Sequence, residues 1–335
     1  MADVGKISPT KITTYMGCSM AYFLKYEAHE KVPTAIRMLF GKETHTMLDQ
    51  FYKLNFQDFE KFANSFCFRF RSSVAGDFLK GKAKKELKVR EIPYTRKNPE
   101  TGELEECVLR IGNHVNFGHS TSDDDIKKIF FGYRNLGASI CKKFYIKHKP
   151  LKPPFKKEWS FGVKKDEPVE INGIPVRGVI DRIDEKNGDW YITDYKTDKS
   201  SPEENSFLLH RNIQFTMYSY IFRKEFKIKE KAMLYYHLRK LKTFETHRGE
   251  KDYDYMKFLI DKVVDGIIKN VFIPFYGFHC NWCDFMPPCE KYCMDYHGGP
   301  RIDLEGRIIG AEKFTEWDSD VPERYDWLNM GIEER

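Results

Sequence analysis

The sequence predicts an α/β fold, and three features of its 335 residues lead to this prediction. Apolar residues recur at helical spacing through much of the first 150 residues. Short alternating runs, rich in β-branched and aromatic residues, begin near residue 156 and indicate strands. Hydrophobic residues make up 41% of the chain, which is enough to build a sizeable core.

The first predicted helix begins at Ser8 and Pro9, because serine caps helices and proline suits their first position. Ile12, Tyr15 and Met16 follow it at helical spacing. The same period predicts further helices over residues 39–52, 56–79, 123–147, 207–226 and 252–269.

Strand character is concentrated between residues 156 and 247, where Asn172-Gly173 is a strong hairpin-turn signal. Residues 80–125 are less regular, and residues 98–102 suit a turn between short strands. The runs 159–163, 169–171, 176–183 and 190–195 predict a β-meander of three or four strands, and the runs 232–238 and 242–247 predict another hairpin.

The net charge of +6 is mildly basic. It suits a polyanionic partner, but many proteins without such a partner are equally basic. No apolar run approaches the roughly 18 to 20 residues that cross a bilayer. Residues 1–8 lack the apolar stretch of a signal peptide. We therefore expect a cytoplasmic protein that does not contact membranes.

Two carboxylates and a lysine form the most informative pattern in the chain. Asp194 and Lys196 are two apart on a predicted strand and so face the same side, and the hairpin can bring Asp181 alongside them. Carboxylates bind Mg²⁺ or Mn²⁺, which polarises a phosphate oxygen and lowers the pKa of bound water. Lysine can orient that water or stabilise the transition state. The pattern therefore suits phosphodiester hydrolysis.

The competing interpretation is a surface hairpin with an Asp194–Lys196 salt bridge, since Asp-x-Lys alone is common. The neighbouring residues argue against it. Ile180 and Ile183 flank Asp181, and Ile192 precedes Asp194, so both carboxylates lie in partly buried strands. Burying unpaired charge is costly, and such charges need a reason.

These residues also carry a family resemblance. The runs 178–184 and 194–197 resemble the paired core motifs of the RecB-like branch of the PD-(D/E)XK nucleases. The run 214–218 is similar to that family's Gln-x-x-x-Tyr motif, and the run 41–45 to its Gly-x-x-x-His motif. Residues 7–18 resemble the start of the nuclease domain in AddB-type proteins and in CRISPR-associated RecB-like exonucleases.

The resemblance implies a restriction-endonuclease-like core, with a central mixed sheet flanked by helices. It implies a single nuclease domain over residues 1–294 and a C-terminal extension over residues 295–335. The domain would comprise a helical part (1–150), a catalytic sheet core (151–250) and a cysteine region (270–294).

The resemblance also implies roles for individual residues. The metal would be bound by His45, Asp181 and Asp194, assisted by the backbone carbonyl of Tyr195. Lys196 would be the catalytic lysine, while Gln214 and Tyr218 would orient the site and the DNA strand. Taken alone, His45 is more readily a helix histidine without a ligand role, and the presence of the other motifs reverses that preference. Asp184 could simply pair with Arg182 or with a lysine.

Four of the eight cysteines crowd into residues 280–293, a pattern that favours metal binding over disulfides in an intracellular chain. Their spacing does not choose between zinc and an iron–sulfur cluster. The resemblance implies a [4Fe–4S] cluster held by Cys18, Cys280, Cys283 and Cys289, joining the N- and C-terminal regions, with Zn²⁺ as the alternative. Cys293 would be surplus or a substitute ligand, and Cys67, Cys107 and Cys141 would be core thiols.

We therefore expect a DNA nuclease, favouring exonuclease action on single-stranded ends in recombination, repair or replication. The alternatives are a non-catalytic DNA-binding or assembly subunit and an RNA nuclease. A protein partner in a recombination, replication or CRISPR-type complex is also expected. Residues 142–147 and 235–240 interleave rings and basic side chains, as in surfaces that stack on single strands, or as in core rings beside solvated lysines. No phosphate-binding loop of the Gly-x-x-x-x-Gly-Lys-Ser/Thr type is present, so ATP use is not expected.

Overall fold

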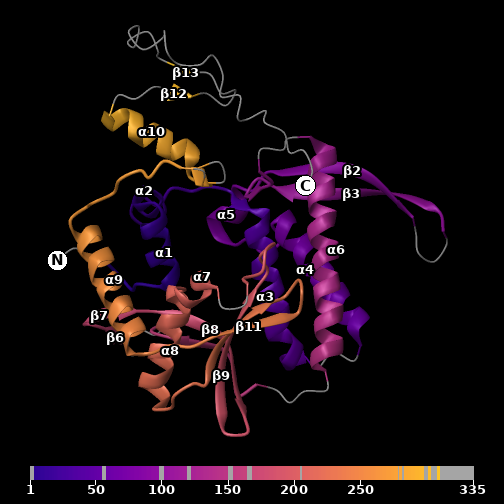
Figure 1. Ribbon diagram of the computed structural model, residues 1–335. Coiled ribbons are helices and arrows are strands. Elements are labelled where there is room, and N and C mark those ends of the chain that lie inside the picture. The colour runs from indigo at the N-terminus through magenta and orange to yellow at the C-terminus, as the bar shows by residue number, and fades with distance from the viewer. Residues whose placement is uncertain are drawn as a thin grey trace. The chain divides into compact units, whose positions relative to one another are not determined.

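The fold is that of a computed structural model, shown in Figure 1. It describes residues 4–54, 58–97, 102–118, 122–149, 154–163, 168–203, 206–277, 279–280, 283–297, 301–302 and 308–309. The chain divides into two compact units, Met1–Asp284 and Phe285–Arg335, which are described separately. The predicted limit of the nuclease domain at residue 294 stays a prediction.

The helices and strands follow the chain in a mixed order. The first unit contains, in turn, α1 (Pro9–Gly17), α2 (Ser19–Tyr22), the π-helix η1 (Phe23–Glu27), β1 (Thr34–Ala35), α3 (Ile36–Leu54), α4 (Phe59–Ala75), α5 (Gly81–Lys85), β2 (Val89–Lys97), β3 (Leu104–Gly112), β4 (Val115–Asn116), α6 (Asp123–His148), β5 (Lys156–Phe161), β6 (Val169–Ile171), β7 (Ile174–Val176), β8 (Gly178–Lys186), β9 (Asp189–Lys196), α7 (Phe207–His210), α8 (Ile213–Phe226), β10 (Ala232–His237), β11 (Lys242–Thr246) and α9 (Glu250–Ile268). The second unit contains α10 (Met286–His297), β12 (Arg301–Ile302) and β13 (Ile308–Ile309).

The main sheet has five strands in the order β11-β10-β9-β8-β5. Strands β9 and β10 pair in parallel, while the other neighbours are antiparallel. A parallel pair needs a crossover connection, and α7 and α8 lie in the segment between β9 and β10. The predicted central mixed sheet and the predicted hairpin of β10 and β11 are thus confirmed.

The predicted β-meander is only partly right, because β6 and β7 form a hairpin of their own. Its turn residues Asn172 and Gly173 both have positive φ, as the sequence signal requires. The chain leaves the main sheet at Gly162, whose φ is +62° and where a Cβ would lie 1.9 Å from the carbonyl oxygen of Val176. The N-terminal segment then joins this hairpin through Ile7, which exchanges backbone hydrogen bonds with residues 175 and 177.

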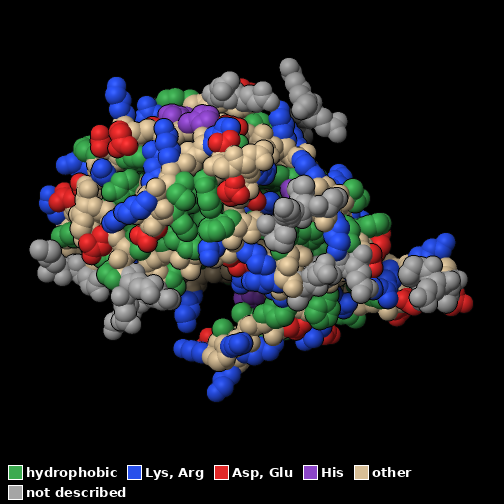
Figure 2. All heavy atoms as spheres, turned by 90° about the horizontal axis from the view of Figure 1, so that it is seen from below, with side chains coloured by type: hydrophobic (Ala, Val, Ile, Leu, Met, Phe, Trp, Pro, Cys, Tyr) green, Lys and Arg blue, Asp and Glu red, His purple; other side chains and the backbone are tan. Residues whose placement is uncertain are grey.

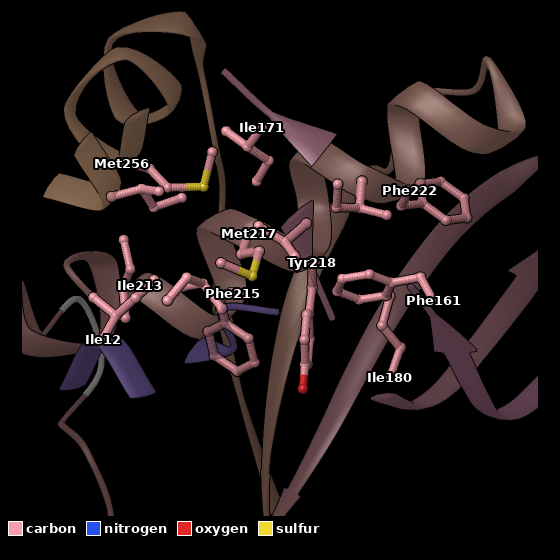
Figure 3. Packing of buried hydrophobic residues seen from close by; sticks show 14 of the residues in the cluster. Ile12, Phe161, Ile171, Ile180, Ile213, Phe215, Met217, Tyr218, Phe222 and Met256 are labelled. Carbon is pink, nitrogen blue, oxygen red and sulfur yellow. The ribbon is translucent and has the colours of Figure 1, made fainter. Parts of the chain in front are cut away.

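Helices cover both faces of the main sheet, with a separate hydrophobic core on each face. Successive strand residues point to opposite faces, so Tyr235 enters one core and Tyr236 the other. Figure 3 shows the first core, where α8 lies between the sheet and α9. Its labelled side chains include Phe215 and Met217 from α8, Phe161 and Ile180 from the sheet, and Met256 from α9. The second core is built mainly from α3, α4 and α6.

Strands β2 and β3 pair along nine residues each, on either side of residues 98–102. The predicted strands around this turn are therefore confirmed, but they are longer and more regular than the sequence indicated. In this pair Ile92, Leu109, Ile111 and Gly112 are buried. Most other residues of the two strands are at least partly exposed, on both faces of the hairpin, and many are polar. The alternation of apolar and polar residues that marks a half-buried strand is therefore absent. Most of the predicted turn at 98–102 lies outside the described residues.

The surface mixes both signs of charge. On the face in Figure 2, Lys and Arg side chains are interspersed with Asp and Glu and with hydrophobic side chains. Within the described ranges, no helix is both long enough and apolar enough to cross a membrane.

Candidate active site

The site lies where strands β8 and β9 separate. Their ladder of paired residues ends at Arg182 and Thr193. One residue further, the carboxylate of Asp181 takes the place of a backbone acceptor, because its Oδ2 receives the N–H of Tyr195 at 2.8 Å. This fork places the Asp181 side chain beside the position of Asp194 on the neighbouring strand.

Asp194 and Lys196 project from β9 on one side, as their spacing predicts. The side chain of Asp194 is 2% exposed, and its Oδ2 lies 2.5 Å from the Nζ of Lys196. Burial raises the pKa of Asp194 to about 6, against the opposing effect of the Lys196 ammonium. Burial also lowers the pKa of Lys196, but the neighbouring carboxylates more than offset this and leave that pKa raised. Lys196 therefore keeps its positive charge.

Helix α8 supplies the next two predicted residues, one turn apart. Gln214 donates from Nε2 to Oδ1 of Asp194 at 3.0 Å and to the hydroxyl of Tyr218 at 2.9 Å. Its Oε1 accepts from Nζ of Lys196 at 2.9 Å. The helix begins here because the side chain of Asn212 caps the backbone N–H of Gln214. One amide thus connects a carboxylate, an ammonium and a phenol.

His45 reaches the site from the opposite layer, on α3. Its Nδ1 lies 3.3 Å from Oδ1 of Asp181. Burial lowers the pKa of His45, but the charge of Asp181 outweighs it and leaves the pKa raised. One turn earlier, a Cβ on Gly41 would lie 3.4 Å from Oγ1 of Thr197, so glycine here lets α3 approach the end of β9. This contact gives the Gly-x-x-x-His spacing a physical reason.

The donor types of these residues fit a divalent metal ion, since carboxylate oxygens and an imidazole nitrogen converge at the fork. Apart from the Lys196 ammonium, the buried Oδ2 of Asp194 has no hydrogen-bond partner among the described residues. No group of three His, Cys, Asp or Glu side chains in the described part of the chain is already arranged to hold a metal ion. Here the Asp181 and Asp194 carboxylates contact His45, Gln214 and Lys196 instead.

Two further carboxylates near the fork were missed by the sequence reasoning. A small cavity beside Asp181 is lined by His45, by Asp49 one turn further along α3, and by Glu158 of β5. Glu158 lies opposite Asp181, between the pairs Lys157–Arg182 and Trp159–Ile180, and has a φ of +44°. The spacing of Asp49 four residues after His45 could have placed it on the same helix face. No pattern in the sequence predicts the positive φ of Glu158.

Asp184 belongs to a structural ion pair, as the alternative interpretation held. Arg182 donates to its carboxylate twice, at 2.6 and 2.8 Å, and both side chains are buried. The same guanidinium also donates to the hydroxyls of Tyr52 and Tyr195, at 2.7 and 3.2 Å. The ring of Tyr195 therefore points into the second core, away from Asp194.

The two runs that interleave rings and basic residues supply core residues. Phe144, Tyr145, Tyr235 and Tyr236 are all buried. The alternative interpretation is right for these four rings, which pack in the two cores and are not exposed for stacking on bases.

The N-terminal cysteine and one C-terminal cysteine contact the same short segment. The Sγ of Cys18 accepts from the N–H of Phe275 at 3.5 Å, and the Sγ of Cys280 lies 3.9 Å from the carbonyl oxygen of Phe275. Next to Cys18, the hydroxyl of Ser19 binds both backbone groups of Ile273, at 2.7 and 3.0 Å. Residues distant in sequence are thereby joined.

The other cysteines differ in their surroundings. Cys283 is half-buried in the first unit, and Cys289 lies on α10 of the second unit. Cys141 is a core thiol as predicted, and its burial strongly raises its pKa. Cys67 is half-buried against the second core. Cys107 is half-buried on the β2–β3 hairpin and belongs to neither core cluster, so its prediction as a core thiol is wrong.

The fold and the site together define a class of protein: an α/β protein with a carboxylate–lysine centre at a fork in its sheet, suited to metal-assisted hydrolysis. Comparison with protein families matches residues 6–290 to the PD-(D/E)XK nuclease superfamily, and the chain belongs to this superfamily. Its nucleases generally use Mg²⁺ or Mn²⁺. No curated protein matches the chain.

Proposed function

We propose that this chain is a Mg²⁺- or Mn²⁺-dependent deoxyribonuclease of the RecB-like branch. It hydrolyses phosphodiester bonds as an exonuclease on single-stranded DNA ends, in recombination, repair or replication. The observation that carries the proposal is the meeting of Asp181, Asp194 and Lys196 at the fork, with Gln214 in contact with two of them.

The roles that we propose are those that the family resemblance implies, and the contacts of these side chains support them. His45, Asp181 and Asp194 would hold the metal, with the backbone carbonyl of Tyr195. When bound, the metal polarises a phosphate oxygen and lowers the pKa of the attacking water. The Lys196 ammonium stabilises negative charge that develops on the phosphate. Gln214 and Tyr218 hold these groups in place.

We further propose a [4Fe–4S] cluster held by Cys18, Cys280, Cys283 and Cys289, with Zn²⁺ as the alternative occupant. The contacts of Cys18 and Cys280 with the same residue support the first half of this set. The spacing of Cys283 and Cys289 in the sequence supplies the rest. A cluster of this kind links segments far apart in the chain and restricts the unfolded state.

The proposed partners are DNA, with single strands favoured, and a protein of a recombination, replication or CRISPR-type complex. An intracellular location stays part of this proposal. A non-catalytic binding subunit is the less favoured function, because it has no need of the buried Asp194 beside Lys196 and Gln214.

The first experiment compares wild type with Asp194→Asn, which removes the charge but keeps the size of the side chain. Substrates are a 5′-labelled linear single strand, a circular single strand, a duplex and an RNA strand of the same sequence. Each is incubated with Mg²⁺, Mn²⁺ or EDTA. We expect metal-dependent shortening of the linear strand, sparing of the circle, and at least a roughly 1,000-fold loss in the variant.

Asp189→Asn is the matched control, since this aspartate pairs with Lys231 at the exposed β8–β9 turn. It should cut like wild type. Cleavage of the circle would replace exonuclease with endonuclease action, and preferential RNA cleavage would replace DNA as the substrate. No cleavage of any strand, with DNA binding retained, would support the binding subunit instead.

A further inference from the structure

A groove opens on the first-core side of the molecule, between the N-terminal helix and the elements around α8. It has a volume of about 550 Å³ and is lined by residues of α1, α7, α8 and α9 and by the loop before α8. Pockets of about 300–1,000 Å³ accommodate ligands of drug size, and a nucleotide falls within that class. Gln214 lines this groove and also contacts Asp194 and Lys196. A molecule in the groove therefore lies next to the proposed reaction centre.

Two exposed aromatic rings line the groove, with an arginine near both. Phe207 is 66% exposed and Tyr255 is 44% exposed. The guanidinium of Arg211 lies 4.8 Å from the ring centroid of Phe207 and 5.3 Å from that of Tyr255. Planar faces of this kind are the surfaces on which nucleic-acid bases stack, and arginine adds a cation–π contribution.

The positive charge in the groove favours a ligand that carries negative charge. Arg211 is the one charged side chain among the described residues that line it. The polar residues beside it, such as Thr10, Thr13 and Asn212, carry no charge. A groove with apolar walls and a single positive group suits a ligand with planar apolar faces and an anionic backbone.

We propose that this groove binds the bases of the nucleotides that adjoin the scissile phosphate, by stacking on Phe207 and Tyr255 without regard to base identity. This inference rests on the proposed nuclease function and names its substrate more closely. In a duplex the base faces are already stacked on one another, so only a single strand offers them to the groove. The groove thereby selects single strands.

The test measures binding without cleavage, by fluorescence anisotropy in EDTA. The probes are a 5′-labelled oligothymidylate and a strand of equal length with abasic positions, which keeps the phosphates and removes the bases. The double variant Phe207→Ala/Tyr255→Ala is compared with wild type. Phe258→Ala is the matched control, because Phe258 is 53% exposed on α9 but does not line the groove.

We expect the double variant to bind oligothymidylate roughly ten- to a hundredfold more weakly than wild type does. The two proteins should bind the abasic strand with the same affinity. The control should match wild type on both strands. Because Phe207 and Tyr255 are exposed, the double variant should also keep the wild-type melting temperature.

The inference would be overturned if the double variant bound oligothymidylate as tightly as wild type does and neither protein distinguished it from the abasic strand. This outcome would count whether or not the protein cuts DNA. If the double variant instead converted a dimer to a monomer in sedimentation, with unchanged DNA binding, the groove would be assigned to a second copy of the chain. Base-dependent binding by a protein that cuts no substrate would refute the nuclease function and leave the groove standing.

Discussion

Gln214 donates a hydrogen bond to Asp194 over 3.0 Å, and this bond ties helix α8 to strand β9. The opposite end of the same amide accepts from Lys196. The amide is therefore oriented by a carboxylate on one side and an ammonium on the other, which leaves it one favourable orientation. We propose that Gln214 is a positioning residue, because its two hydrogen bonds help to hold the side chains of Asp194 and Lys196 in place.

Replacing Gln214 should reduce cleavage without unfolding the protein. We expect Gln214→Ala to lower kcat about 10- to 100-fold, the range for partners that orient metal-binding groups. Gln214→Glu should be no better, because it loses both donated bonds and adds a negative charge beside Asp194. Gln50→Ala on α3 is the control, and single-turnover kinetics is the measurement. A Gln214→Ala enzyme with wild-type kcat would remove the positioning role.

Glu158 combines a strained backbone with a place at the active-site cavity. A non-glycine residue with a φ of +44° costs about 1 kcal/mol or more, and such strain gathers at functional sites. Glu158→Gly should therefore stabilise the fold by about 1 kcal/mol in urea unfolding while cleavage falls. Glu158→Gln should reduce cleavage without the gain in stability. If Glu158→Gly kept full cleavage, the strain would have no connection with the site.

Much of the active site follows from short-range spacing in the sequence. The two-residue interval between Asp194 and Lys196 and the four-residue interval between Gln214 and Tyr218 each place two side chains on one face of one element. Such intervals survive folding because the period of a strand or helix is local. The α/β class and the shared side of Asp194 and Lys196 were predictable for this reason. The central mixed sheet and the roles of His45, Gln214 and Tyr218 were instead predicted from the family resemblance.

The features that were missed depend on the backbone or on distant contacts. The turn at Gly162 that takes β6 and β7 out of the main sheet is set by its contact with Val176, fourteen residues along the chain. The position of Glu158 opposite Asp181 depends on the register between β5 and β8. Neither leaves a periodic pattern, so spacing alone could not reveal them.

His148 should make the fold sensitive to acid. Burial lowers its pKa to about 3, and it lies 3.0 Å from the hydroxyl of Tyr236 and stacks on Phe144. The unfolded chain binds a proton there near pH 6.5 and the folded chain does not, so this contribution to stability is present above pH 6.5 and lost as pH falls towards 3. Between pH 7 and 5 the loss is about 2 kcal/mol.

The comparison of wild type with His148→Gln in urea at pH 7 and pH 5 measures this effect. The variant should lose about 2 kcal/mol less than wild type over that interval, whatever its stability at pH 7. His247→Gln, at an exposed histidine, serves as the control. Equal acid losses in wild type and His148→Gln would mean that His148 is not the residue that resists protonation.

The cysteines provide the sharpest test of how the two ends of the first unit are joined. Cys18 and Cys280 both contact Phe275, so a cluster built on them closes a loop over most of the chain. By the relation between loop length and entropy used for cross-linked chains, closing a loop of this length is worth about 5 to 6 kcal/mol. If the proposed cluster is present, anaerobically purified wild type should contain iron, and Cys18→Ala should lack it and melt well below wild type.

Cys107→Ala is the matched control, because Cys107 is half-buried on a hairpin away from Cys18 and should keep both iron and stability. Metal analysis and calorimetry together decide the outcome. If metal analysis found zinc in place of iron, the cysteines would still join the two ends of the first unit, but through Zn²⁺. A Cys18→Ala protein with wild-type metal content and melting temperature would mean that Ser19 and Tyr15, which bind the backbone of residues 271–273, join the two ends without any metal.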